Sequence, residues 1–364
     1  MFVTTNIIVG ILFFIGCYVN LFNPLYFWFL GFVNLIAFYL LALLIIFIVF
    51  WIVVKPRYSF ISVISIAICF TAIQHIIPFR KGSSFTKEKQ AQALRVMSWN
   101  VSSFDLIAYS KTGDKTVFNG MMDLIKEYQP DVLCMQEVAL GDSNITVVHH
   151  VKGLSDTLGM KYYKYSYNEE WYLNLHYGVI TYSKYPIVGG HTIMEYPYTY
   201  NYTSQCVDIL VNADTFRVFN FHLESLKFNP DTYEYLDKPI SEQAKDLDKS
   251  KSIISRIKHG YIRRYHQVNK IKKEIEQSPY PVIVCGDFND VPNSYPYKEL
   301  GKGLKNSFVE KGSGLGRTFM SISPTLRIDN IFVDPKFDVL QYNRVKKKLS
   351  DHYPIMADIE FKKN

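Results

Sequence analysis

Residues 282–290 read VIVCGDFND, an apolar run that ends in glycine and then offers acidic and amide side chains. The unbroken run predicts a buried β-strand, Val282–Cys285, with Gly286 marking its end. Asp287 and Asn289 lie two positions apart, so in extended backbone their side chains project to the same side. This stretch therefore predicts a buried strand that delivers two oxygen-bearing side chains to one edge of a sheet.

Similar runs recur after about residue 93, rich in Val, Ile, Phe and Tyr and bounded by Gly, Pro, Asn or Asp. Helical spacing occurs at Phe118–Ile125 and Ile262–Ile275. Strand runs dominate and do not alternate strictly with helices, so we predict a mixed α/β sheet sandwich rather than a parallel doubly wound fold. The other predicted strands are Leu94–Ser98, Val132–Met135, Gly178–Tyr182, Val207–Val211, Phe216–Phe221 and Ile328–Val333.

Polar motifs follow these runs at the position where an open sheet binds its ligands. Alone, each motif is an ordinary polar turn. Together they supply carboxylates, amides and two histidines but no cysteine, a donor set that suits a hard cation such as Mg²⁺ rather than zinc. The motifs are SWN at 98–100, QE at 136–137, NFH at 220–222, GDFN at 286–289, RID at 327–329 and SDH at 350–352.

In this order, SWN, QE, NFHLES, GDFND, RIDN and SDHYPI resemble the motifs of the endonuclease/exonuclease/phosphatase superfamily, over about residues 93–361. The resemblance implies an α/β fold, a four-layer αββα sandwich of the deoxyribonuclease type with its site at the sheet tops. It also implies a metal-dependent phosphoric ester hydrolase. Ser102 stands where apurinic endonucleases usually carry an acid, which argues against that branch. The whole chain resembles the membrane-anchored bacterial branch, with several spans before the catalytic domain.

The resemblance also implies roles for individual residues. Glu137 would be the principal Mg²⁺ ligand, with Asn100 and Asp351 close to the same ion or to the phosphate, and Asn100 would also bind the substrate. Mn²⁺ is an open alternative. Asp287 would orient or deprotonate the attacking water, and Asn289 would hold a phosphate oxygen. The metal and the water-orienting carboxylate would thus approach the phosphate together, as phosphoester hydrolysis requires.

Other implied roles concern the phosphate and the leaving group. His352 would face the scissile phosphate, oriented by Asp329, which alternatively only caps a strand. His222 would be a second donor to the phosphate or the general acid toward the leaving oxygen. Thr318 resembles a position near the substrate but is equally well an ordinary strand residue, and Arg263 could meet a phosphate-rich or membrane-surface substrate.

The N-terminal part has a different composition. From Met1 to Phe79 there is no Asp or Glu. Its three apolar stretches, roughly Thr4–Phe22, Leu25–Val54 and Tyr58–Phe79, each reach or approach the ~20 residues that a spanning helix needs. We therefore predict three transmembrane helices within an anchor at 1–79, a connector at 80–92 and a catalytic domain at 93–364.

The charged residues near the spans give conflicting indications of orientation. Lys55 and Arg57 are the only basic residues before Phe79 and lie in a short loop, which the positive-inside rule places in the cytoplasm. With three spans, the catalytic domain would then lie on the periplasmic side of a bacterial inner membrane. A second basic group just after the third stretch argues the other way, but long domains translocate largely regardless of charge, so we favour the periplasmic side. That group is Arg80, Lys81, Lys87 and Lys89.

Residues 245–273 hold ten basic and two acidic residues. Such a stretch attracts phosphates, nucleic acid or an anionic membrane, or is simply a solvated helix face. The leading hypothesis is a membrane-anchored Mg²⁺-dependent phosphodiesterase or phosphatase acting on a lipid headgroup or envelope substrate. The alternative is a membrane-tethered Mg²⁺-dependent nuclease. A catalytically silent phosphate-binding module is disfavoured, because the metal and water-orienting residues are all present, and no protein partner can be inferred.

Overall fold

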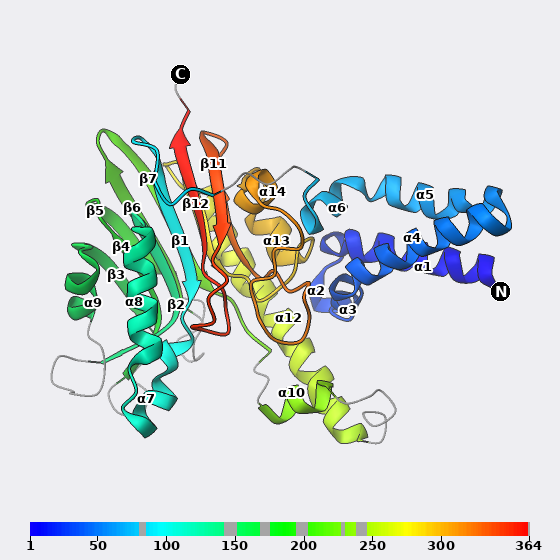
Figure 1. Ribbon diagram of the computed structural model, residues 1–364, viewed down its shortest axis with the longest axis horizontal. Coiled ribbons are helices and arrows are strands. Elements are labelled where there is room, and N and C mark those ends of the chain that lie inside the picture. Colours follow the sequence, from blue (N-terminus) through cyan, green and yellow to red (C-terminus); the bar gives the residue numbers. More distant parts are fainter. Residues whose placement is uncertain are drawn as a thin grey trace.

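Two six-stranded sheets lie face to face at the centre of the computed structural model (Figure 1). The structure describes residues 1–79, 85–141, 151–167, 175–193, 203–226, 230–237 and 246–362. In the first sheet the order is β11-β12-β1-β2-β4-β3, and in the second it is β5-β6-β7-β8-β10-β9. One pair in each sheet is parallel, β1 with β2 and β7 with β8, and the other pairs are antiparallel.

The strands of the first sheet are β1 (Leu94–Asn100), β2 (Val132–Gly141), β3 (Tyr162–Tyr167), β4 (Leu175–Ser183), β11 (Phe337–Arg344) and β12 (Ile355–Phe361). Those of the second are β5 (Ile187–Ile193), β6 (Ser204–Val211), β7 (Asp214–His222), β8 (Val282–Asp287), β9 (Lys305–Asn306) and β10 (Asp329–Val333). All seven predicted strands are present, and most extend beyond the apolar run that predicted them.

Apolar side chains from both sheets meet in one core, which includes Val96, Cys134, Val218, Cys285 and Ile355. Helices cover the two outer faces. The first sheet packs against α8 (Thr116–Tyr128) and α9 (Val151–Leu158), and the second against α12 (Leu247–Glu276) and α13 (Tyr295–Leu300). The described residues thus form the four layers α, β, β and α that the sequence predicts. Shorter helices are η3 (Ser102–Asp105), α7 (Leu106–Thr112), α10 (Pro230–Asp237) and α14 (Ser307–Lys311).

The N-terminal region is helical, but its helices differ from the three predicted spans. Within the described residues, Ala37–Val54 is the one helix long and apolar enough to cross a membrane. Phe2–Cys17 is shorter, and Pro56–Ile68 with Phe70–Ile76 passes the same test only as a pair bent by 68°. The helices are α1 (Phe2–Cys17), η1 (Val19–Leu21), α2 (Pro24–Phe27), α3 (Leu30–Leu35), α4 (Ala37–Val54), η2 (Pro56–Tyr58), α5 (Ser59–Ile68) and α6 (Phe70–Ile76).

Breaks in the helices account for the difference. Asn23 accepts a hydrogen bond from the Leu25 amide and, with Pro24 following, starts α2 at the boundary between the first two predicted stretches. The second predicted stretch, Leu25–Val54, is itself divided into α2, α3 and α4, and Ile36 leaves helical geometry between α3 and α4. Cys69 leaves helical geometry between α5 and α6. Apolar composition alone does not record such breaks, because the residues on both sides remain hydrophobic.

Figure 1 shows α1, α4 and α5 side by side, projecting from the sheets with the N-terminus at the far end. Phe13, Leu44 and Cys69 are fully buried between these helices. Asn6 and Ser62 form a buried hydrogen bond of 2.8 Å inside the bundle. The outward-facing side chains of the bundle are apolar and exposed, among them Ile8, Ile11, Ile46, Val49, Val53, Phe60 and Ile64.

Candidate active site

The register of the second sheet places three candidate residues side by side. In the parallel pair β7 and β8, His222 lies opposite Asp287, and in the antiparallel pair β8 and β10, Asp329 lies opposite Asp287. All three side chains are buried. Strand order alone thus brings residues from three separate motifs to one level at the end of the sheet.

The first sheet contributes Asn100 and Glu137 from the parallel pair β1 and β2. Asn100 lies opposite Gln136, and Glu137 is the next residue. The register of β2 shifts between Met135 and Val138, and Glu137 has a φ of +51°, which an L-residue rarely adopts. Such a bulge re-aims a side chain, and Glu137 turns its carboxylate toward the other sheet.

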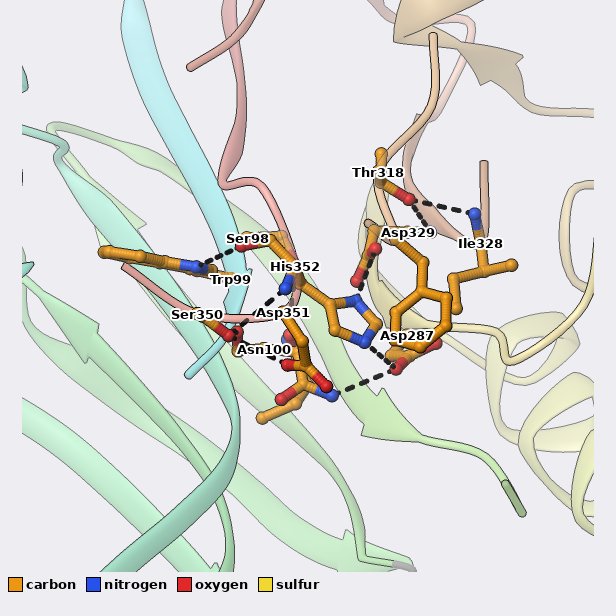
Figure 2. A network of polar contacts seen from close by, with 12 residues as sticks. Ser98, Trp99, Asn100, Asp287, Thr318, Ile328, Asp329, Ser350, Asp351 and His352 are labelled. Atoms are coloured by element: carbon orange, nitrogen blue, oxygen red, sulfur yellow. Dashed lines mark hydrogen bonds and ion pairs between the residues drawn. The ribbon is translucent and has the colours of Figure 1, made fainter. Parts of the chain in front are cut away.

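Figure 2 shows Asn100 of the first sheet and Asp287 of the second side by side. The Asn100 amide nitrogen donates to Glu137 Oε1 at 2.9 Å and to Asp287 Oδ2 at 3.0 Å. His222 Nε2 lies 3.4 Å from the same Glu137 oxygen and 3.7 Å from Asp287 Oδ2. Asn100, Glu137, His222 and Asp287 therefore form one polar cluster that joins the two sheets.

His352 lies on the other side of Asp287. Its Nδ1 is 2.8 Å from Asp329 Oδ2, and its Nε2 is 3.7 Å from Asp287 Oδ2 (Figure 2). Burial alone would lower the pKa of His352, but the carboxylates of Asp329 and Asp287 outweigh burial and raise that pKa well above its usual value. His352 is therefore a protonated donor with one nitrogen fixed by Asp329.

The pKa of Asp287 is also raised, but chiefly by burial. Its complete burial, followed by the nearby charge of Asp329, raises the pKa of Asp287 to about 6, against the smaller lowering effects of His352 and His222. A carboxylate with a pKa in this range can accept a proton near neutral pH. The cluster thus pairs a proton acceptor with a proton donor.

The donor set is suited to a divalent cation. One ligand atom from each of Glu137, His222 and Asp287 lies within 4.8 Å of the other two, and Asp287, Asp329 and His352 form a second such group. Two carboxylates converge on Asn100 in the first group, and a cation there would offset their mutual repulsion. Oxygen ligands favour Mg²⁺ or Mn²⁺, so the residues present fit the predicted metal, and Glu137 would be its principal ligand.

Two predicted ligands are placed differently from these carboxylates. Asn100 presents its nitrogen to them, while its Oδ1 accepts from the Ser102 backbone amide at 3.0 Å. Asp351 is exposed and accepts from the Ser350 hydroxyl at 3.1 Å. Asn100 therefore orients the two carboxylates, and Asp351 lies at the rim beside His352 (Figure 2).

Besides Asn100, the three other predicted substrate contacts lie in different surroundings. Asn289 donates one amide hydrogen to the Leu223 carbonyl at 2.8 Å and has a second to offer a phosphate oxygen. Thr318 is fully buried, and its hydroxyl accepts from the Ile328 and Asp329 amides, so it positions Asp329 (Figure 2). Arg263 is about half exposed on α12 and pairs with Glu224 at 3.1 Å.

Several supporting residues were not identified from the sequence pattern. Trp99 Nε1 donates to the His352 carbonyl at 3.0 Å, and Ser350 Oγ donates to the Asn100 carbonyl at 2.8 Å (Figure 2). Gln136 Nε2 donates to Asn220 Oδ1 at 2.8 Å across the two sheets. All four of these residues lie within the motifs quoted from the sequence. Their place in a motif was the sequence feature that could have identified them as supports of the site.

The N-terminal helices contact the loop that carries Asp287 and Asn289. Asn34 of α3 donates to the Pro292 carbonyl at 3.0 Å, and buried Asn293 donates to the Ala72 carbonyl at 2.9 Å. Buried Arg327, two residues before Asp329, donates to the carbonyls of His75 and Ile76. The end of the helical bundle therefore supports two of the chain segments that form the site.

Comparison with known proteins gives two sequence families. The profile of the endonuclease/exonuclease/phosphatase family matches residues 97–352. That of a domain of unknown function (DUF8431) matches residues 1–76. None of the curated proteins compared matches the chain.

Among solved structures, an endonuclease/exonuclease/phosphatase from Beutenbergia cavernae has a TM-score of 0.53 and 18% identity over 74% of this chain and 72% of its own. The human nocturnin catalytic domain with bound sulfate has a TM-score of 0.53 and 17% identity, covering 75% and 95%. A mannosyl-6-phosphatase from Bacteroides thetaiotaomicron has a TM-score of 0.50 and 19% identity, covering 74% and 100%. At these identities the likeness shows a common fold.

Proposed function

The chain belongs to the endonuclease/exonuclease/phosphatase family, and we propose that it is a membrane-anchored, Mg²⁺-dependent phosphoester hydrolase. The observation that carries the proposal is the convergence of Glu137, Asp287 and His352, with Asp329 holding His352 and Asn100 joining the two carboxylates. Solved structures of this fold include an enzyme named as a sugar phosphatase and a domain that holds sulfate, an analogue of phosphate in shape and charge.

In this proposal Glu137 would be the principal ligand of Mg²⁺, and the ion would supply positive charge to the non-bridging phosphate oxygens. Asp287 accepts a proton from the attacking water, because its raised pKa makes it a competent base near neutral pH. Protonated His352 donates to a phosphate oxygen. Asn289 donates its free amide hydrogen to another oxygen, and His222 is either a further donor or the acid toward the leaving group.

Membrane anchoring is supported by the apolar surface of the helical bundle. Ile46, Val49 and Val53 are all exposed on α4, and a soluble protein rarely displays apolar surface on such a scale. Figure 1 shows α4 leading away from the sheets and α5 returning, so the loop with Lys55 and Arg57 lies at the far end. With that basic loop in the cytoplasm, the catalytic region lies on the opposite, periplasmic side of a bacterial inner membrane.

The preferred substrate class is a phosphoester of a lipid headgroup or another envelope component, since the anchor holds the site near a membrane. A second candidate, a membrane-tethered nuclease, is favoured by the basic residues of α12, where Lys258 and Arg263 are exposed. The test is a panel of duplex DNA, RNA, phosphosphingolipid, phosphoinositide and sugar phosphate. Each would be offered to the detergent-solubilised full chain with Mg²⁺ or EDTA, and the cleaved substrate identifies the class. Absence of metal-dependent cleavage across the panel would contradict the hydrolase proposal.

Metal removal gives the next prediction. We expect EDTA to abolish cleavage and Mg²⁺ to restore it. We also expect Glu137→Gln to raise the Mg²⁺ concentration for half-maximal activity by at least about tenfold, because a carboxylate ligand is lost. Glu127→Gln is the matched control, because Glu127 lies on α8 in surface ion pairs with Lys87 and Lys347. Equal Mg²⁺ titration curves for wild type and Glu137→Gln would exclude Glu137 as a ligand.

The pH dependence should respond to Asp329→Asn. Activity requires His352 protonated, so it falls as pH rises through the His352 pKa, which Asp329 raises. Asp329 also raises the pKa of Asp287, which must be deprotonated and therefore sets the acidic limb. We expect Asp329→Asn to move both limbs of the profile of kcat/KM against pH toward lower pH, measured at saturating Mg²⁺. An unchanged alkaline limb would show that the protonation of His352 does not limit the reaction.

A further inference from the structure

A group of aromatic side chains lies where the helical bundle meets the rest of the molecule. Tyr26 is 73% exposed, and Phe27 and Phe29 are also exposed, on and just after α2. Tyr and Trp side chains at the end of an apolar bundle, here Tyr26 and Trp28, are typical of the boundary between lipid tails and headgroups. Position and composition therefore place α2 at the level of the outer headgroups when α4 spans the bilayer.

The long helix α12 packs against the segment that follows α2. Ile257 and Tyr261 of α12 form a buried cluster against which Trp28 and Phe32 pack. Gly31 permits this contact, because a Cβ at that position would come within 2.2 Å of the Tyr261 ring. Lys258 Nζ lies 5.9 Å from the centre of the Trp28 ring. In Figure 1, α10 and the N-terminal half of α12 project below the sheets, and the helical bundle projects to the right.

The exposed face of this half of α12 is basic. From Lys249 to Arg264 the sequence contains six Lys or Arg and no Asp or Glu. Lys251, Ile254 and Lys258 recur at intervals of three and four residues, so they share one exposed face of the helix. That face combines cations with an apolar side chain, the composition of helices that lie on anionic membranes.

We propose that α2 and the face of α12 formed by Lys251, Ile254 and Lys258 are one contact surface for the headgroups of anionic phospholipids in the leaflet next to the catalytic region. The inference rests on the proposed anchoring function. The occupant follows from charge and position, since the basic face continues directly from the aromatic end of the bundle. Arg263, about 18 Å along the helix from Lys251, pairs with Glu224 near His222, so the surface leads from the bilayer to the rim of the site.

The test uses a fluorescent probe on α12 of the full chain in lipid nanodiscs. The five cysteines are all buried, so a cysteine introduced by Ile254→Cys can be labelled selectively with bimane. Lys273→Cys, exposed on the same helix about 28 Å away, is the matched control. Nanodiscs contain phosphatidylcholine alone or with phosphatidylglycerol, each with or without lipids spin-labelled near the headgroup.

We expect the spin-labelled lipids to quench the probe at position 254 more strongly in anionic nanodiscs, and to quench the control at neither composition. The double change Lys251→Glu with Lys258→Glu should abolish the additional quenching, while thermal unfolding in detergent remains that of the wild type. Equal quenching at both positions, or quenching independent of lipid charge, would overturn the inference. The inference would also be overturned if neither an aqueous quencher nor the spin-labelled lipids quenched the probe, because a protein partner would then cover this surface.

Two parallel measurements separate this inference from the proposed function. Retention of the chain in carbonate-washed membranes reports anchoring, and metal-dependent cleavage of the substrate panel reports the hydrolase. A chain that is retained and active but shows no lipid contact at position 254 overturns the surface alone. A chain that is released from washed membranes overturns anchoring and the surface together.

Discussion

Asp287→Asn is expected to lower kcat for phosphoester hydrolysis by on the order of 10³-fold. Asn keeps the size of Asp but cannot accept the proton of the attacking water. Asp287 also lies at the centre of the polar cluster, where Asn100, His222 and His352 all approach its Oδ2. Steady-state cleavage of the best panel substrate at saturating Mg²⁺ measures the loss.

The variant should remain folded, which makes the measurement interpretable. Burial raises the pKa of Asp287, so the ionised carboxylate is itself a cost to the folded state above about pH 6. Removing that charge should leave the thermal unfolding temperature equal or higher at neutral pH. Asp338→Asn is the control, since Asp338 is exposed on β11. Activity of Asp287→Asn within tenfold of wild type would exclude Asp287 as the base.

Much of the site could be predicted because strand ends are visible in the sequence. Asn100, Glu137, His222 and Asp287 each follow an apolar run, and parallel pairing then brings them to the same edge. The order of the motifs added Asp329 and His352, which come together at 2.8 Å from different parts of the chain. No local pattern measures that distance, because it depends on how β10 and the loop before β12 lie in the folded molecule.

Other features of the fold and the site could not be predicted, because they depend on backbone geometry that the amino-acid composition does not determine. The bulge that turns Glu137 toward Asp287 is a backbone event within an ordinary apolar strand. The strands β3 and β5 went unpredicted because YYKYSY is largely exposed and IVGGHTI contains two glycines. Thr318 resembled a substrate contact, but its position opposite two backbone amides makes it a support for Asp329.

The contact between the helical bundle and the catalytic region was the least predictable feature, and Arg327 provides its sharpest test. The sequence suggests that residues 1–79 and 93–364 are joined only by a polar connector. Arg327 is fully buried, its guanidinium lies 4.1 Å from the centre of the Phe308 ring, and it donates to carbonyls of both α6 and the segment before Thr318. It therefore connects the helical bundle to the strand that begins with Asp329.

Arg327→Met is expected to lower the free energy of unfolding by about 3 kcal/mol, because Met leaves the buried carbonyl oxygen of Ile76 and the partly buried ones of His75 and Leu315 without this donor. Thermal unfolding of the full chain in detergent measures this loss. Lys336→Met is the matched control, since Lys336 is an exposed cation just beyond the other end of β10. If Arg327 acts only on stability, kcat at a temperature where the variant is folded will equal that of the wild type. A reduced kcat with an unchanged Mg²⁺ requirement would instead show that the helical bundle positions Asp329. An unchanged unfolding temperature would show that Arg327 does not stabilise the contact between the bundle and the catalytic region.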